Sequence, residues 1–352
     1  MIFINLTYGF GNNLFQFHFG RIISQKYNLN FYCVGKVSIH FKKYLGELPN
    51  EYVIIRDNYK NGRKKSIDTL IEEIDQNKNK NILLLGFFEF KDFFIDYQKE
   101  IISYHKLNNF LFDKYYFKIT KDLNVIHIRL NNRLVSLNHS LNWIDPNKLF
   151  DTIFLKFPHI KKWIIISDFK FSSNETENII NQLRNELLEG PNKYSFLINR
   201  KHSISYINDW NAAIQKHKDR LTLLEETEVD SVNFLNSSGG LNSEFLNDFK
   251  ILMNSENIMF WGSTFSWWAS FLSNKSSIII GSPWRMDRKP DFDPSLDKTN
   301  FHNIQNIDLK VIKYNNHKKR SLLVRYYDMI PFMYRAFYSK LINYLNKKIF
   351  LR

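Results

Sequence analysis

The chain has 352 residues, of which 44% are hydrophobic and 24% charged, and its formal net charge at pH 7 is +14. This length suits two domains of ordinary size, each able to bury its own core. No apolar run approaches the roughly 18 to 20 residues needed to cross a bilayer, and a single cysteine, Cys33, excludes an intramolecular disulfide framework. Residues 1–6 read as a strand without the pattern of a secretory signal, so we expect a cytoplasmic protein.

The positive charge is concentrated at the C-terminal end. Residues 317–352 contain nine Lys or Arg and one acid, Asp328, and therefore carry +8 of the net charge. After Pro331 the apolar residues fall on one helical face, which is typical of a basic amphipathic helix lying on an anionic membrane surface. The alternative is a helix packed back on its own protein with a solvated basic face. No nucleic-acid motif accompanies the charge, so nucleic acid is not expected as a partner.

The first half of the chain alternates strands and helices. Residues 2–7 predict a strand, residues 7–13 a glycine-bearing turn, and residues 14–27 a helix. A dinucleotide fingerprint fails here because Leu14 stands where the third glycine belongs. The turn at Gly11 and Asn12 still lets backbone approach a ligand closely, which makes both residues candidates for the wall of a site. Beyond it we expect a helix over 66–76, a strand over 81–88 and a helix over 91–105, whereas residues 35–66 show no clear pattern.

The second half repeats this alternation. Strands are expected over 124–129, 163–168, 194–198, 257–261 and 276–280, with helices over 175–188, 204–216, 241–254 and the stretch that follows Thr264. Alternation of this kind predicts an α/β fold with a parallel sheet covered on both faces. Ligands of such sheets lie at the carboxyl ends of the strands. We place the domain boundary in the aromatic-rich link over 110–120.

Ser263 and Thr264 stand where a short buried strand turns into a helix. The first amides of a helix lack partners inside the helix and carry the positive end of its dipole, so this junction is a candidate anion site. The plainer alternative is an apolar core face with a Ser/Thr cap. His127 and Arg129 close a neighbouring strand, and an Arg fork matches a phosphate by two charge-assisted hydrogen bonds. A core histidine followed by an outward-pointing arginine is the alternative for that pair.

These segments resemble motifs of the α-1,2-fucosyltransferases, glycosyltransferase family eleven. Residues 9–16 are similar to the opening Gly-Gly-Leu-Gly-Asn-Gln-Leu-Phe-Gln of that family, residues 86–89 to Gly-Tyr-Phe-Gln, residues 127–129 to the start of His-x-Arg-Arg-Gly-Asp, and residues 166–168 to part of Phe-Ser-Asp-Asp. Residues 248–253 followed by 263–269 are similar to its most distinctive block. The five blocks occur in the family's order and cover roughly residues 5–285.

The resemblance implies two Rossmann-like domains facing a cleft, the B-type glycosyltransferase fold. The domains would be 1–121 on the acceptor side and 122–310 for the GDP-sugar, followed by the tail over 311–352. It also implies an inverting, metal-independent transfer of fucose from GDP-fucose to a glycan hydroxyl, with an α-1,2 linkage. The residues that match donor-binding positions are Gly11, Asn12, Arg129, Asp168, Ser263, Thr264 and Phe265.

For catalysis the resemblance points to His127 and Arg129, which would meet the charge on the departing pyrophosphate. The general base is open among Glu89, His139, His18 and Asp168, although Asp168 can equally cap a loop and Glu89 can be an exposed acid at a strand end. No metal is expected, because the Asp-x-Asp at residues 291–293 follows a proline and reads as a solvated turn.

This chain departs from the family at three positions, with Leu130 in place of the second Arg, Asn131 in place of the Gly and Asn132 in place of the Asp. Two alternatives to the fucosyltransferase therefore stay open. One is a transferase of the same fold that uses another GDP-hexose. The other is a GDP-sugar- or glycan-binding protein that has lost its catalytic chemistry.

Overall fold

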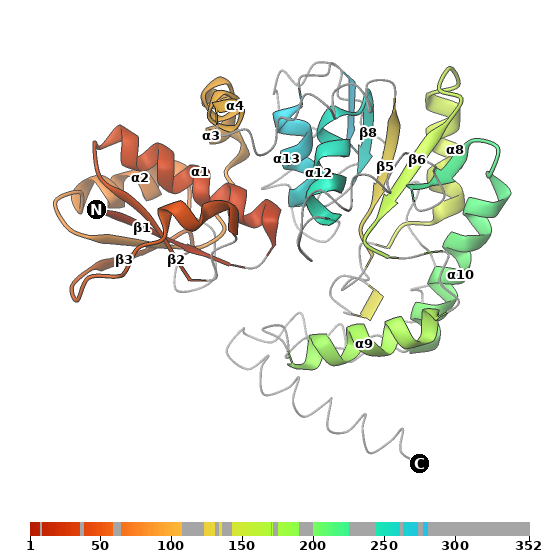
Figure 1. Cartoon of the computed structure of the whole chain (residues 1–352), viewed down its shortest axis with the longest axis horizontal. Helices are drawn as coiled ribbons and strands as arrows, with labels where there is room; N and C mark the ends of the chain where they lie inside the picture. Colours follow the sequence, from red (N-terminus) through yellow and green to blue (C-terminus); the bar gives the residue numbers. More distant parts are fainter. Residues whose placement is uncertain are drawn as a thin grey trace, which may run out of the picture.

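Two parallel β-sheets form the framework of the protein, one in each half of the chain (Figure 1). The computed structural model describes residues 1–7, 9–35, 39–58, 65–107, 123–130, 134–135, 143–169, 171, 175–189, 200–224, 244–260, 263–273 and 277–280. The strand order is β2-β1-β4-β3 in the first sheet and β7-β6-β5-β8-β9 in the second. All neighbouring strands are parallel. The predicted α/β class is confirmed, and the arrangement is compatible with a two-domain Rossmann-like fold.

The described residues of the first half form four strands, a 3-10 helix and four α-helices. In chain order they are β1 (Ile2–Leu6), α1 (Phe10–Lys26), β2 (Phe31–Gly35), η1 (Ile39–Tyr44), β3 (Val53–Arg56), α2 (Ile67–Gln76), β4 (Ile82–Leu85), α3 (Lys91–Asp96) and α4 (Gln98–Leu107).

The second half contributes the remaining described elements. They are β5 (Asn124–Ile128), α8 (Pro146–Lys156), β6 (Trp163–Ser167), α9 (Thr176–Glu189), α10 (Arg200–Lys216), β7 (Leu221–Leu223), α12 (Glu244–Asn254), β8 (Asn257–Phe260), α13 (Thr264–Leu272) and β9 (Ser277–Ile280).

Helix α1 is buried on nearly all sides because it lies between the first sheet and helices of both halves. On the sheet side, Ile2, Ile4 and Leu6 of β1 point into the same core as α1, while Phe3 points to the opposite face. This is the alternation that a strand imposes. On the other side, the Phe15 ring of α1 stacks on Trp267 of α13 with centroids 4.8 Å apart.

The hydrophobic core is therefore shared by the two halves, whereas we expected each half to bury its own. One continuous cluster joins β1 and α1 to α12, α13 and residues of the second sheet such as Val125 and Phe260. A second cluster fills the opposite side of the second sheet. Helices α12 and α13 stand between the two sheets (Figure 1), and Gln98 of α4 donates to the carbonyl of Phe271 at 2.8 Å. Burial at this junction stabilises both halves at once.

Several boundaries differ from the sequence-based predictions. Helix α1 begins at Phe10 instead of 14, so Gly11 and Asn12 lie in its first turn and not in a loop. The helix expected over 91–105 is broken at Tyr97 into α3 and α4. Strand β3 lies in the stretch that showed no pattern, and α8 and β7 were not predicted. The expected strand over 194–198, the link over 110–120 with the boundary at 121/122, and the tail over 311–352 lie outside the described residues.

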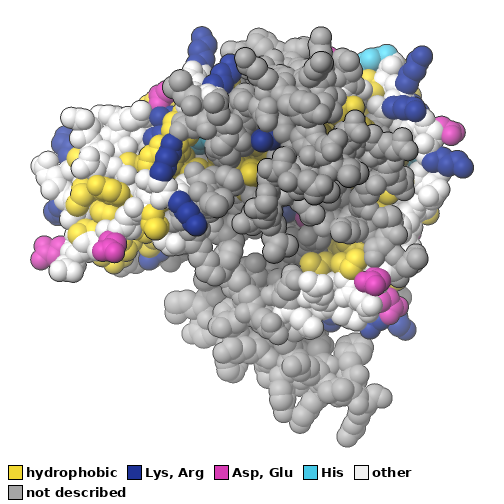
Figure 2. Space-filling model, in the orientation of Figure 1, with side chains coloured by type: hydrophobic (Ala, Val, Ile, Leu, Met, Phe, Trp, Pro, Cys, Tyr) yellow, Lys and Arg dark blue, Asp and Glu magenta, His cyan; other side chains and the backbone are white. Residues whose placement is uncertain are grey.

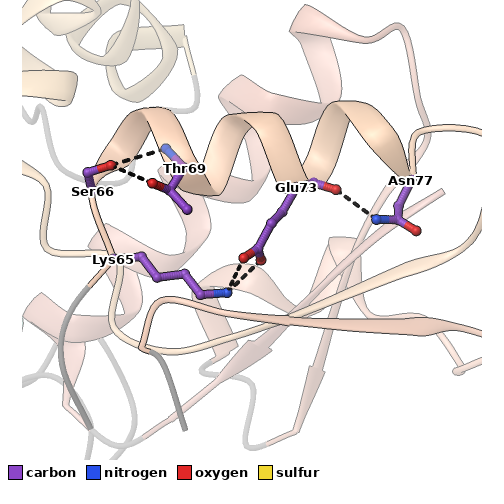
Figure 3. Close-up of polar contacts among 5 residues, drawn as sticks. All are labelled: Lys65, Ser66, Thr69, Glu73 and Asn77. Atoms are coloured by element: carbon purple, nitrogen blue, oxygen red, sulfur yellow. Dashed lines mark hydrogen bonds and ion pairs between the residues drawn. The ribbon is translucent and has the colours of Figure 1, made fainter. Parts of the chain in front are cut away.

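Helix α2 shows how local sequence fixes an element (Figure 3). Ser66 is its N-cap, with the side-chain oxygen accepting from the amide of Thr69 at 3.1 Å, which satisfies one of the amides left open at a helix start. Lys65 reaches along the helix to both carboxylate oxygens of Glu73, at 2.6 and 2.5 Å. At the other end, Asn77 donates to the carbonyl of Glu73 at 2.8 Å. The cap and the ion pair together determine where α2 begins.

The surface in Figure 2 is mixed in character. On this face, hydrophobic side chains gather over the first half of the chain, at the left of the view, beside Lys and Arg side chains. The exposed large hydrophobic residues of that half include Leu45, Leu48, Ile54 and Phe87. Among the helices of the described ranges, none combines the length and the apolar character that crossing a membrane requires.

Candidate functional site

The predicted strand-to-helix junction is present between β8 and α13. Ser263 is the N-cap of α13, in an extended conformation, and its side-chain oxygen accepts from the amide of Ser266 at 3.3 Å. The amides of Thr264 and Phe265 are the first two of the helix and have no partner inside it. Both amides lie at the positive end of the helix dipole.

The hydroxyl groups at this junction are engaged within the protein. The Thr264 hydroxyl donates to Oδ1 of Asn12 at 2.9 Å, which links α13 to the first turn of α1. Ser266 Oγ lies 2.5 Å from Nδ1 of His127. Ser263 and Thr264 are both buried. The Thr264 hydroxyl hydrogen is thus engaged by Asn12, whereas the Ser263 oxygen accepts from Ser266. The expectation that these two hydroxyls donate to a phosphate stays a prediction.

Gly11 provides the space for this contact. A Cβ atom at Gly11 would lie 2.4 Å from the amide nitrogen of Phe265 and 2.7 Å from Oγ1 of Thr264. The room that we assigned to a ligand is thus occupied by the first turn of α13. The N-termini of α1 and α13 meet at this point, and their partial positive charges add. Two like helix ends side by side favour an anion next to them.

His127 and Arg129 lie at the end of β5 beside this junction. His127 is 6% exposed and is held by Ser266, and its ring centroid is 5.7 Å from that of Phe265. Arg129 follows the last residue of β5 and is partly exposed. The structure therefore brings His127 together with Phe265 and the α13 N-terminus, and it places Arg129 two residues further along the same chain.

Asp168 lies at the same edge of the second sheet, where its carboxylate holds a neighbouring segment of the chain in place. Its Oδ1 accepts from the amide of Leu130 at 2.6 Å, so it ties the chain beyond β5 to the end of β6 and fixes the segment that carries Arg129. This contact favours the alternative in which Asp168 caps a loop. The segment that it caps is the one after β5, and not the one that follows Asp168 in the chain.

The candidate bases are in very different surroundings. Glu89 is partly exposed in the turn after β4. His18 is fully buried, with Nε2 2.8 Å from Nε2 of His105. Burial lowers the pKa of His18 well below its usual value, and the charges of His105 and Arg21 lower it further. His18 is therefore wrong as a base, because no substrate reaches it. His139 lies outside the described residues.

Sequence reasoning missed a polar network at the carboxyl edge of the first sheet. Gln16 accepts from the amide of Thr7 at 3.0 Å and donates to the carbonyl of Gly86 at 2.7 Å. Asn13 donates to the Gln16 side chain at 3.2 Å and also to the carbonyl of Thr7. Asp57, which is 4% exposed, accepts from the chain after Gly86. The available signal was the run of amide side chains in α1, whereas nothing in the sequence singled out Asp57.

No metal centre forms in the part of the chain that is described: no three His, Cys, Asp or Glu side chains gather there as ligands. The Asp-x-Asp at residues 291–293 lies outside that part. A scan against protein-family models found no match, and a search of curated proteins found no similar one. The fold and this site define a mixed α/β protein with two parallel sheets, in which the N-terminus of α1 from the first half contacts the N-terminus of α13 from the second half.

Proposed function

We propose that the protein is an inverting glycosyltransferase of the B-type fold that moves fucose from GDP-fucose to a hydroxyl group of a glycan. One observation carries this proposal. The N-termini of α1 and α13 meet beside His127, two residues before Arg129, at the carboxyl edge of a parallel sheet. This edge is where α/β folds bind nucleotides, and the local charge suits a diphosphate. The resemblance of the five sequence blocks supplies the donor and the reaction.

The donor diphosphate would bind at the first turn of α13. The positive end of the α13 dipole attracts one phosphate, and the guanidinium of Arg129 donates two parallel hydrogen bonds to the other. His127 orients the site through its bond to Ser266. These donors are fixed before the substrate arrives, so they need no reorganisation during the reaction.

The reaction is a single displacement. The oxygen of the acceptor hydroxyl forms a bond to C1 of fucose while the bond from C1 to the phosphate oxygen breaks, and the configuration at C1 inverts. The electron pair of the broken bond stays on GDP, where the positive helix ends and Arg129 stabilise it. The hydroxyl proton passes to a carboxylate base, for which Glu89 in the turn after β4 is the candidate among the described residues.

Calorimetric titration with GDP, GDP-fucose and GDP-mannose tests the donor site. We expect GDP-fucose to bind most tightly and Arg129→Ala to weaken it about 10- to 100-fold, because hydrogen bonds to charged groups contribute roughly 1.5 to 3 kcal/mol. Lys216→Ala is the matched control, since it removes a positive charge from an exposed pair with Asp151 elsewhere in the second half. Absence of binding to all three compounds would refute the proposal.

The same titration separates the alternatives. A preference for GDP-mannose would assign another GDP-hexose as the donor. Tight binding of GDP-fucose with no transfer to any acceptor in a glycan panel would assign a binding protein without catalysis, in keeping with the changes at Leu130 and Asn132.

For the cellular site of action, we propose a cytoplasmic protein that touches an anionic membrane through residues 317–352, which suits a lipid-linked or surface glycan as acceptor. The charge of this segment is the basis. Sedimentation with vesicles containing phosphatidylserine tests it: removal of residues 317–352 should abolish co-sedimentation, and unchanged co-sedimentation would refute it.

A further inference from the structure

His127 lies in the central strand of the second sheet, with its backbone fixed between β6 and β8. Its neighbours Ile126 and Ile128 point into the core cluster on the far side of this sheet. Because side chains alternate along a strand, His127 points to the opposite face, where Val125 lies in the core that includes α13. The strand itself therefore directs the imidazole at α13.

Ser266 meets this ring from the first turn of α13. Its Oγ lies 2.5 Å from Nδ1 of His127, and its amide donates to Oγ of the N-cap Ser263 at 3.3 Å. The Ser266 side chain is fully buried. Within the part of the chain that the structure describes, Nδ1 of His127 is the one hydrogen-bond partner of Ser266 Oγ. A buried hydroxyl and one ring nitrogen are thus in direct contact.

The burial of Ser266 decides which atom supplies the hydrogen of this bond. A hydroxyl has one hydrogen to donate, whereas a neutral imidazole carries its hydrogen on either nitrogen. If Nδ1 donated, the Ser266 hydrogen would be buried without an acceptor, which destabilises a protein by more than an average hydrogen bond stabilises it. The hydroxyl therefore donates to Nδ1, and the ring carries its hydrogen on Nε2. The positive helix ends beside the ring also disfavour a cationic imidazolium.

The position of this hydrogen determines what His127 can do at a ligand site. With the hydrogen on Nε2, the nitrogen that Ser266 does not hold is a hydrogen-bond donor, and it lacks the lone pair that a general base needs. A donor suits an oxygen of a departing diphosphate. It does not take a proton from an acceptor hydroxyl.

We propose that Ser266 is the positioning residue that keeps His127 neutral with its hydrogen on Nε2, so that His127 donates a hydrogen bond to a diphosphate oxygen and is not the base. The role at the diphosphate rests on the proposed function, whereas the form of the ring is a property of the free protein. Ser266 acts through His127 and makes no contact with the ligand.

Nitrogen NMR of the full-length protein with isotope-labelled histidine tests the form of the ring. The chain has ten histidines, and the signal that disappears in His127→Gln belongs to His127. At neutral pH we expect Nδ1 to be unprotonated and Nε2 protonated in the wild type. Ser266→Ala should shift the ratio of the two forms towards protonated Nδ1 by about 3- to 10-fold, because one hydrogen bond is lost. Ser266→Thr keeps the hydroxyl and should preserve the wild-type ratio.

Ser270→Ala is the matched control for Ser266→Ala. Ser270 lies one turn further along α13, and its buried hydroxyl has no hydrogen-bond partner among the described residues. Its removal should leave the spectrum of His127 unchanged. A wild-type ring that is protonated on Nδ1 overturns the proposal, and so does a ratio that Ser266→Ala leaves unchanged. Should Ser266→Ala not fold, the wild-type spectrum and Ser266→Thr decide.

The variant His127→Gln tests the role at the ligand, because glutamine keeps a neutral N–H donor but cannot act as a base. We expect it to bind GDP and transfer fucose within about 3-fold of the wild type, whereas His127→Ala should bind GDP about 3- to 10-fold more weakly. A rate lowered about 100-fold in His127→Gln, with unchanged GDP affinity, would assign the base to His127 and overturn the proposal. An equal loss of GDP affinity in both variants would remove the donor role. If the wild type does not bind GDP, the proposed function fails, and the NMR result still decides the form of the ring.

Discussion

Replacement of Gly11 by alanine tests the contact between α1 and α13 directly. The new Cβ atom would lie 2.4 Å from the amide nitrogen of Phe265 and 2.5 Å from the carbonyl carbon of Thr264. Carbon atoms pack best at about 3.5 to 4.0 Å, so the two helices must separate by roughly 1 Å. The obstructing atoms are backbone, which cannot rotate out of the way. Overpacking of this kind destabilises a protein by roughly 1 to 3 kcal/mol.

Gly20→Ala is the matched control because Gly20 lies in the same helix. There the nearest atom to a new Cβ belongs to the ring of Phe31, at 2.5 Å, and a side chain can move. Both substitutions also favour the helix slightly. Urea unfolding followed by tryptophan fluorescence should show a clearly lower midpoint for Gly11→Ala than for Gly20→Ala. Equal or higher stability of Gly11→Ala would refute the close approach of the two helices.

Three further outcomes follow from described contacts. Thr264→Val removes the bond to Asn12 and should lower the free energy of unfolding by about 1 kcal/mol; a double-mutant cycle with Asn12→Ala measures the coupling, and zero coupling would contradict the contact. Ser66→Ala removes the N-cap of α2 and should also destabilise by about 1 kcal/mol in urea unfolding, whereas Ser66→Asp should not. Burial lowers the pKa of His18 and brings that of His105 to about 3. Both imidazoles therefore stay neutral in the folded protein while the unfolded chain takes up protons below about pH 6.5. Their contribution to stability should be complete above that pH and should decline as the pH falls towards 3, at up to about 1.4 kcal/mol per pH unit for each histidine. Unfolding midpoints from pH 7.5 to pH 5 measure this decline, which His105→Gln should reduce; an equal decline in that variant would count against the neutral pair.

The elements that sequence predicted well are those whose pattern is local. The sequence predicted β8, the N-cap at Ser263 and the apolar helix α13. This was possible because capping and periodicity depend on residues that are close together in the chain. Strand β3 was missed because four residues among charged neighbours give little periodicity, and its burial comes from pairing with β4, which is distant in the sequence.

The candidate site was predicted only in part, because its decisive contacts join distant segments. Sequence placed Gly11 beside a ligand, but it could not tell that the first turn of α13 fills that space. It also could not distinguish the buried His18 from a solvent-facing base, since burial there depends on α4 and α13. Asp57 gave no signal because its role is defined by the amides of a turn about 30 residues away.

The core that α1 and α13 share has a mechanical consequence. Because Phe15 stacks on Trp267 and Phe94 packs against Trp268, the two halves cannot swing apart without exposing aromatic surface to water. We therefore expect one cooperative unfolding transition and a fixed spacing between the two sheets. In a transferase with this architecture, access and closure would have to come from loops around a stiff frame and not from hinge motion of whole domains.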